Sequence, residues 1–145
     1  MKDTGYPLRK AFYELLDGNL TYKSIDVPVY DDVLMESADL YVILSSQTKS
    51  PSDNFCTFVS NCTITLDIVH KSPFTFTKDA VDSIHNQIGQ LLSTGPGRNS
   101  LPFQSGFQFS TLQEDSFSYL PTLQSGVDGY ITRKLITYRI RIVEQ

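Results

Sequence analysis

Two long stretches of the chain alternate between apolar and polar positions, which is the period of a strand with one buried face. In residues 55–70 the apolar face consists of Cys56, Phe58, Cys62, Ile64, Leu66 and Ile68, interrupted only by Ser60. In residues 130–143 it consists of Ile136, Tyr138, Ile140 and Ile142. The opposite faces are rich in Thr, Asn, Asp and Arg. The pattern predicts two strands of an antiparallel sheet that has one solvated face.

Shorter stretches predict the remaining strands. Residues 40–44 are strongly β-prone and are expected in the sheet interior. Residues 27–30 contain Pro28, which cannot donate a ladder hydrogen bond, so this piece belongs at a sheet edge. Phe107 and Phe109 begin a strand that is expected to continue, through a bulge, to Tyr119. Residues 45–54 and 98–105 are predicted as loops, and residues 120–129 as a hairpin connection.

Two stretches have helical periodicity instead. Residues 7–17 are expected to form a helix that starts at Pro7 and stops at Gly18. Its apolar stripe is Leu8, Phe12, Leu15 and Leu16. A second helix is expected to be capped by Thr77, to carry Asp79 in its first turn, and to end before Gly95. Its stripe is Val81, Ile84, Ile88, Leu91 and Leu92.

The predicted order of elements is therefore α-β-β-β-α-β-β. Helices and strands are mixed without repeating βαβ units, which favours an α+β fold. We expect a mostly antiparallel four- to five-stranded sheet with both helices packed on one face. Residues 1–145 contain no internal repeat and no linker long enough to divide them, so one domain is predicted.

Composition limits the classes of function. An apolar fraction of 40% and a charged fraction of 19% are typical of a globular protein. A net charge of −4 argues against a protein that grips nucleic acid through its phosphates, although DNA could still pass it without being held. The first residues lack the apolar stretch of a signal peptide, and no apolar run reaches the roughly 18–20 residues of a membrane helix. We expect a soluble protein made in a cytoplasm, with no membrane partner.

Catalytic and metal-binding patterns are missing from the sequence. The two histidines, His70 and His85, have no partner at metal-ligand spacing. Residues 95–98 follow a predicted helix, where glycines cap and turn the chain, and lack the Gly-Lys-Ser/Thr of a phosphate loop. The acidic set Asp31, Asp32, Glu36 and Asp39 lacks EF-hand spacing and is interpreted as a solvated loop. The prediction is a protein that is not an enzyme and has no cofactor or metal.

The two cysteines are predicted to be buried free thiols. On one continuous strand, Cys56 and Cys62 would lie roughly 20 Å apart. A disulfide requires Cα atoms within about 7 Å of each other.

Arginines are the one charged feature of note. Arg133, Arg139 and Arg141 alternate along the solvated face of the last predicted strand. They could pair across strands with carboxylates such as Asp67, or they could dock a neighbouring subunit, since Arg is enriched at interfaces. Contact with DNA is the third interpretation and is disfavoured by the net charge. With Arg98 they form the set of candidate subunit-interface residues.

Several segments together resemble a known family. They are residues 7–16 (PLRKAFYELL), 29–33 (VYDDV), 40–44 (LYVIL), 81–84 (VDSI) and 135–141 (LITYRIR). Their order and residue types resemble the tail-completion proteins of tailed bacteriophages, which comprise tail terminators and neck ring proteins. The resemblance runs over almost the whole chain. Residues 93–105 and 113–129 look longer than in the compact form of that family, and such insertions are where partners are contacted.

The resemblance implies a structural role in a virion. It implies a homo-oligomeric ring, commonly a hexamer and sometimes a dodecamer, at the head-tail neck or the tail terminus. Such a ring joins or caps the tail, contacts other neck and tail proteins, and lets DNA through its bore without specific binding. It would be assembled in the bacterial host cytoplasm. No catalytic residues are carried over. The alternative from a different class is a small-molecule-binding or regulatory α+β domain of a cellular protein, which would need a concave apolar pocket.

Overall fold

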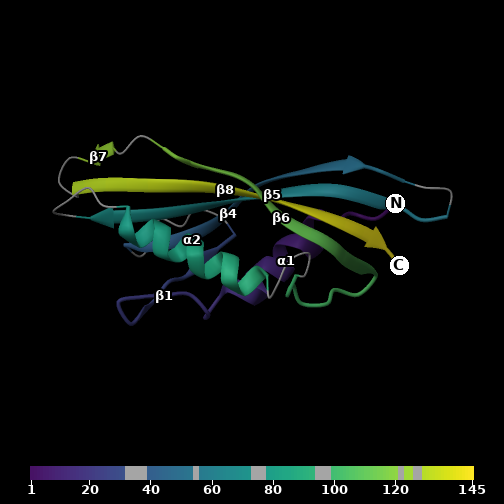
Figure 1. Ribbon diagram of the computed structural model, residues 1–145, viewed down its shortest axis with the longest axis horizontal. Coiled ribbons are helices and arrows are strands. Elements are labelled where there is room, and N and C mark those ends of the chain that lie inside the picture. The colour runs from purple at the N-terminus through teal and green to yellow at the C-terminus, as the bar shows by residue number, and fades with distance from the viewer. Residues whose placement is uncertain (32–38, 54–55, 73–77, 94–98, 121–122, 126–128) are drawn as a thin grey trace.

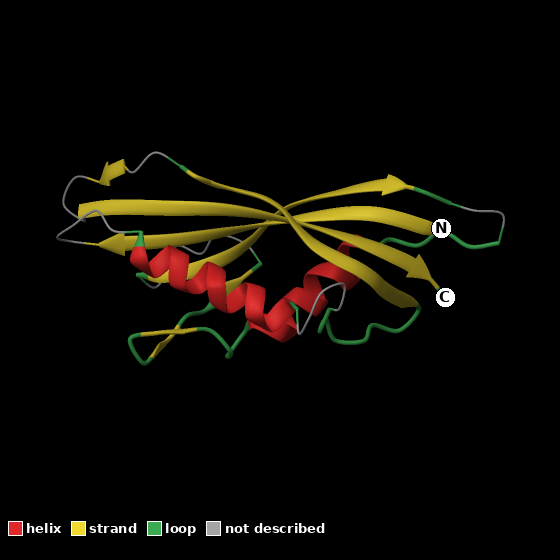
Figure 2. Cartoon of the chain, viewed as in Figure 1, coloured by secondary structure: helices red, strands yellow, loops and turns green. Residues whose placement is uncertain are grey.

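The computed structural model describes residues 1–31, 39–53, 56–72, 78–93, 99–120, 123–125 and 129–145. The two helices are α1 (Gly5–Leu16) and α2 (Asp79–Leu92). The strands are β1 (Thr21–Tyr22), β2 (Ile25–Asp26), β3 (Val29–Tyr30), β4 (Leu40–Pro51), β5 (Val59–Ser72), β6 (Phe107–Tyr119), β7 (Leu123–Ser125) and β8 (Gly129–Glu144). Figures 1 and 2 show both helices lying along the same side of a long, twisted sheet.

The main sheet has six strands in the order β3-β4-β5-β8-β6, with β7 added beside β8. All of its pairings are antiparallel except that of β3 with β4, which is parallel. The pairing of β5 with β8 runs without a register shift from Val59 opposite Val143 to Ser72 opposite Tyr130. β1 and β2 form a separate two-stranded hairpin. The predicted α+β class, with a mostly antiparallel sheet and both helices on one face, is confirmed.

The core lies between the helices and one face of the sheet. Fully buried residues alternate along the strands, as the sequence period predicts; they include Val42, Ile64, Leu66, Ile68, Ile136 and Ile140. The helices meet them with Leu8, Phe12, Leu16, Val81, Ile84, Ile88 and Leu92, all at most 1% exposed. Burying each such side chain contributes about 1.5–3 kcal/mol. This helix-facing side of the sheet is called the helix face below, and the other side the open face.

The open face has an apolar end and a polar end. At one end Tyr41, Ile43 and Val69 form a small second apolar cluster with Tyr30 and Ile131. Toward the other end the face is polar, and threonines pair across strands. The hydroxyl of Thr65 lies 3.1 Å from that of Thr137.

The structure corrects several predictions in the first half of the sheet. Residues 45–51 were predicted as loop, but β4 continues to Pro51 and pairs with β5 after a register shift between Leu44 and Gln47. β5 begins at Val59, so Cys56 precedes the strand and is exposed rather than buried. Cys62 is buried as predicted, and neither of the two cysteines, both described, is in a disulfide.

Helix ends and hairpins account for the other differences. α1 begins at Gly5, earlier than predicted, and Gly18 follows it with a φ of 80°, as expected of a left-handed cap. α2 has Lys78 rather than Thr77 at its N-cap position, and Thr77 lies outside the described residues. The hairpin β1–β2 was not predicted, because it turns through Lys23 and Ser24, both at positive φ, without the usual Asn or Gly.

Candidate functional site

Three of the four candidate arginines lie on β8, on the open face. Arg133 donates from Nε to Oδ1 of Asp67 over 3.4 Å and pairs its Nη2 with the other carboxylate oxygen. Asp67 is 4% exposed, and its hydrogen bonds to Arg133 raise the pKa of that guanidinium. The cross-strand interpretation is therefore correct for Arg133.

The other arginines are more open. Arg139 pairs with Asp115 of β6, with 3.0 Å between Nη2 and Oδ1. Arg141 is exposed and forms no ion pair with any residue that the structure describes. Arg98 lies outside the described residues. Of the four, Arg141 is thus the one whose described surroundings leave its charge available to a partner.

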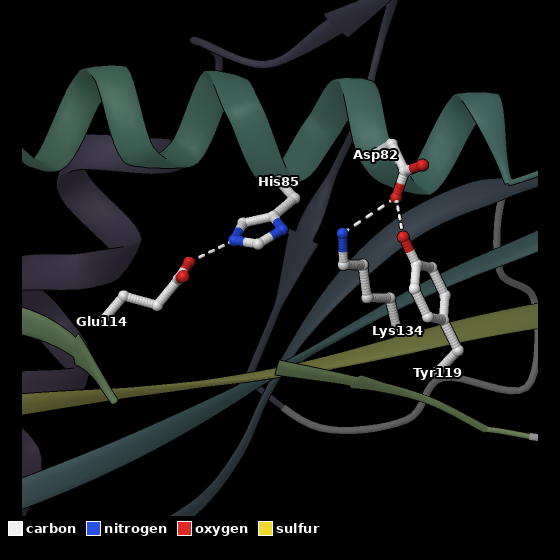
Figure 3. Close-up of polar contacts among 5 residues, drawn as sticks. All are labelled: Asp82, His85, Glu114, Tyr119 and Lys134. Carbon is white, nitrogen blue, oxygen red and sulfur yellow. Dashed lines mark hydrogen bonds and ion pairs between the residues drawn. The ribbon is translucent and has the colours of Figure 1, made fainter. Parts of the chain in front are cut away.

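A cluster of charged side chains under α2 was not predicted. Figure 3 shows Asp82 and His85 of α2 above Glu114 and Tyr119 of β6 and Lys134 of β8. The Lys134 ammonium donates to Oδ1 of Asp82 over 2.8 Å, and the Tyr119 hydroxyl donates to the same oxygen over 2.5 Å. His85 contacts Glu114 through Nε2. These five residues are called the α2 polar cluster.

Lys134 is the buried member of the α2 polar cluster, at 4% exposure. Its ammonium also lies 4.6 Å from the ring centroid of Phe117 and 4.8 Å from that of Tyr119, so two ring faces help to solvate the charge. Burial acts to raise the pKa of Asp82, but hydrogen bonds from Lys134 and Tyr119 outweigh it and hold that pKa below its ordinary value. Asp82 is therefore ionised at neutral pH.

The chemistry available to the α2 polar cluster is limited. A hollow of about 390 Å³ beside it is lined by Asp82, His85, Asn86, Gly89, Gln90, Ser93 and Glu114. No described hydroxyl or thiol is bonded to His85 as an activated nucleophile would be. Among the described residues no group of three or more His, Cys, Asp or Glu side chains could hold a metal ion. The arrangement fastens α2 to β6 and β8.

The sequence carried one signal of the α2 polar cluster. Thr132 and Lys134 fall in phase with the apolar face of the last strand, where a buried lysine requires a partner. The partner Asp82 could not be identified, because it comes from a distant helix whose first turn would tolerate any acidic residue.

A second hollow, of about 440 Å³, lies between the β1–β2 hairpin and the ends of β4 and β5. It is lined by Tyr22, Ile25, Asp26, Val27, Asp39, Leu40 and His70. Nδ1 of His70 is buried there without a described hydrogen-bond partner. Burial lowers the pKa of His70, although nearby Asp39 acts in the opposite direction. This hollow is the concave, partly apolar site that a ligand-binding interpretation requires.

The fold defines the class of the chain as an α+β protein with two helices on one face of a six-stranded, mostly antiparallel sheet. No protein-family model matches the sequence, and no curated protein matches it. Among solved structures, a chain of the "Virion of native gene transfer agent (GTA) particle" is similar, with a TM-score of 0.58 and 17% sequence identity. The similarity covers 81% of this chain and 78% of that chain. At this identity it shows a shared fold. No described helix is long and apolar enough to cross a membrane.

Proposed function

We propose that the chain is a structural component of a phage-like virion, and that its copies form a ring at the head-tail neck or at the tail terminus. The observation that carries this proposal is the shared fold with a virion chain, which extends over most of both chains. The resemblance of the sequence segments to tail-completion proteins points the same way. As a working unit we propose a hexamer or dodecamer in contact with other neck and tail proteins.

The surface chemistry supports a structural role. The most developed polar constellation, the α2 polar cluster, joins elements of the fold and holds no activated nucleophile among the described residues. We therefore propose that the protein is not an enzyme. A net charge of −4 suits a bore through which DNA moves without being held, since like charges repel.

The test is the composition of particles. The gene would be deleted in the cell that encodes it, and particles would be purified from both strains and analysed by mass spectrometry and electron microscopy. The proposal predicts that the chain is present in wild-type particles at a fixed copy number, and that its loss leaves tailless heads or tails of abnormal end or length. Wild-type particles without the chain, or a deletion with normal particles, would refute a virion role.

A second candidate function rests on the hollow beside His70. Its volume of about 440 Å³ and its lining, in which apolar side chains are joined by Asp26, Asp39 and His70, would suit a small molecule. In that case the chain would be a ligand-binding or regulatory domain of a cellular protein. A small-molecule screen by thermal shift separates the two, because a ligand that binds the folded state raises Tm by mass action. A His70→Gln variant, which removes a lining group, should then lose that rise.

A further inference from the structure

The main sheet has two incompletely paired edges, and both are candidates for contact between chains. On the β6 side, Nδ2 of Asn99 donates to the carbonyl oxygens of Phe109 and Ser110, over 3.2 and 3.0 Å, which occupies the start of the strand. From Leu112 to Tyr119 the strand pairs with β8, apart from a register shift at Asp115, and with no other strand in the described part of the chain. Unpaired strand edges of this kind present free N–H and C=O groups to other chains.

The β4 side has a similar bare stretch. β3 pairs only with Val42 and Ile43, and the carbonyl of Pro28 accepts the N–H of Val42 over 3.0 Å. Beyond that point and the register shift after Leu44, residues 47–51 pair with β5 on one side, and no described strand lies on the other side of residues 45–51. The two bare edges are of similar length and stand at opposite ends of the strand order.

Strand directions make the two edges compatible. β4, β5, β8 and β6 are each antiparallel to the next, so β4 and β6 run in opposite directions within one copy. A second copy in the same orientation would therefore meet β6 with an antiparallel β4. The helices of both copies would then lie on the same side of one continuous sheet.

The charges on the two edges are complementary. Residues 107–119 include Glu114 and Asp115 and no basic residue, whereas residues 45–51 include Lys49 and no acidic one. Glu114 lies opposite buried Tyr138, and Lys49 lies opposite buried Cys62, so both charged side chains are on the helix face. Within its own copy Lys49 donates to the carbonyl oxygen of Lys2 over 3.1 Å and Glu114 contacts His85, so a pair between copies would replace these exposed contacts. An opposite-charge pair directly across an antiparallel pairing is stabilising.

We infer that copies of this chain join head to tail: the β6 edge of one copy pairs with residues 45–51 of β4 in the next copy, and Glu114 faces Lys49. Because an antiparallel register moves back one residue for each residue forward, this alignment brings Tyr119 to Leu44. Leu44 follows Ile43, the last residue of β4 that pairs with β3, so the aligned residues of β6 do not overlap the β3–β4 pairing. The inference rests on the proposed function, since it supplies the contact by which a ring would be built.

The twist of the sheet determines what kind of assembly this contact would build. Adjacent strands rotate by roughly 20–25° relative to one another, so each added copy is rotated with respect to the last. A head-to-tail interface of this type joins one surface to a different one. It closes into a ring when the rotation permits and otherwise continues as a filament. Pairing of the same edge with itself would stop at a dimer.

A pair of cysteines tests the contact directly. Within one copy β4 and β6 are separated by β5 and β8, which places them at least about 14 Å apart, beyond the reach of a disulfide. In protein with Cys56→Ser and Cys62→Ala, which removes the thiol directly opposite position 49, the combination Lys49→Cys and Glu114→Cys should give a ladder of disulfide-linked multimers on mild oxidation. The matched control is Ser50→Cys with Glu114→Cys, because Ser50 is on the open face and should give little ladder.

Charge exchange provides a second test with the same logic. Lys49→Glu or Glu114→Lys alone should raise the concentration needed for assembly by up to about fivefold per interface, the upper value for a cross-strand ion pair. The double exchange should restore it. His85→Gln serves as the control for the intramolecular contact that Glu114→Lys also removes.

No ladder from the 49/114 pair, or an equal ladder from the 50/114 pair, would overturn the inference. Failure of the double exchange to restore assembly would do the same. The proposed function has its own test: it would be refuted if the chain were absent from purified particles. If the chain is present in particles but gives no ladder, the proposed virion role stands and only the inferred interface is refuted.

Discussion

The pair formed by Lys134 and Asp82 should respond very unequally to removal of its two partners. Lys134 is 4% exposed, whereas the side chain of Asp82 is 47% exposed. Asp82→Ala therefore leaves an ammonium buried without its carboxylate. Lys134→Met leaves a carboxylate that water can reach and fills the buried space with an apolar chain of similar length.

The magnitudes follow from burial. Breaking a buried ion pair by removing one partner costs about 3–5 kcal/mol. The rings of Phe117 and Tyr119 continue to face the Lys134 ammonium and offset about 1–2 kcal/mol of this. We expect Asp82→Ala to lower the free energy of unfolding by about 2–3 kcal/mol, and Lys134→Met to change it by less than about 1 kcal/mol. For a chain of this size the first change lowers Tm by about 6–12 °C.

Urea denaturation followed by circular dichroism at pH 7 measures both variants, and equal m-values show that the unfolding reaction is the same. Lys134→Ala, which also leaves a cavity, is the control for the packing contribution of methionine. If Lys134→Met proves as destabilising as Asp82→Ala, the burial asymmetry is not what sets the energetics of this pair. The reasoning would then be refuted.

Three further predictions concern single groups. Tyr138→Phe should leave stability unchanged or raise it by about 1 kcal/mol in the same urea assay, because the buried hydroxyl has no hydrogen-bond partner among the described residues; a loss of more than 1 kcal/mol would contradict this. Burial lowers the pKa of His70 below its ordinary 6.5, so the unfolded chain binds this proton first. Stability should therefore be complete above pH 6.5 and decline as the pH falls toward the folded-state pKa, and His70→Gln should remove that part of the decline measured by thermal unfolding. Arg133→Ala leaves the carboxylate of Asp67, 4% exposed, without its ion-pair partner and should lower Tm by several degrees, whereas Arg141→Ala should leave Tm within about 1 °C.

The elements that the sequence predicted best are those with a regular apolar period, because one side of each is buried in the core and the other is not. Ile64, Leu66 and Ile68 on β5, and Ile136 and Ile140 on β8, alternate because one face of each strand meets the helices. That alternation predicts both the strand and its buried face, whereas the pairing of β5 with β8 came from the structure. The stripes of α1 and α2 were predictable for the same reason.

The distal part of β4 was missed because it does not contact the helices enough to need apolar residues. Residues 45–51 are Ser, Gln, Thr, Lys and Pro, which resemble a loop in composition. Only their pairing with β5 makes them a strand, and pairing is a property of two segments rather than one. The same long-range dependence hid the α2 polar cluster, whose members lie on three separate elements.

Among the candidate arginines, one contact was predicted from the sequence and another was not. The predicted cross-strand pairing with a carboxylate such as Asp67 is correct for Arg133, which lies opposite Val69 and reaches Asp67 diagonally on the same face. The contact of Arg139 with Asp115 depends on a bulge in β6, which no sequence period reveals. The interface now inferred uses backbone edges and Lys49 with Glu114, neither of which a search for clustered arginines would find.

The account depends most on self-assembly of the chain, and native mass spectrometry of the purified 145-residue protein measures it most directly. One dominant species at a single integer multiple of 16.3 kDa, with six or twelve copies, is the predicted result. A 16.3 kDa monomer at every concentration, up to the solubility limit, would contradict the ring.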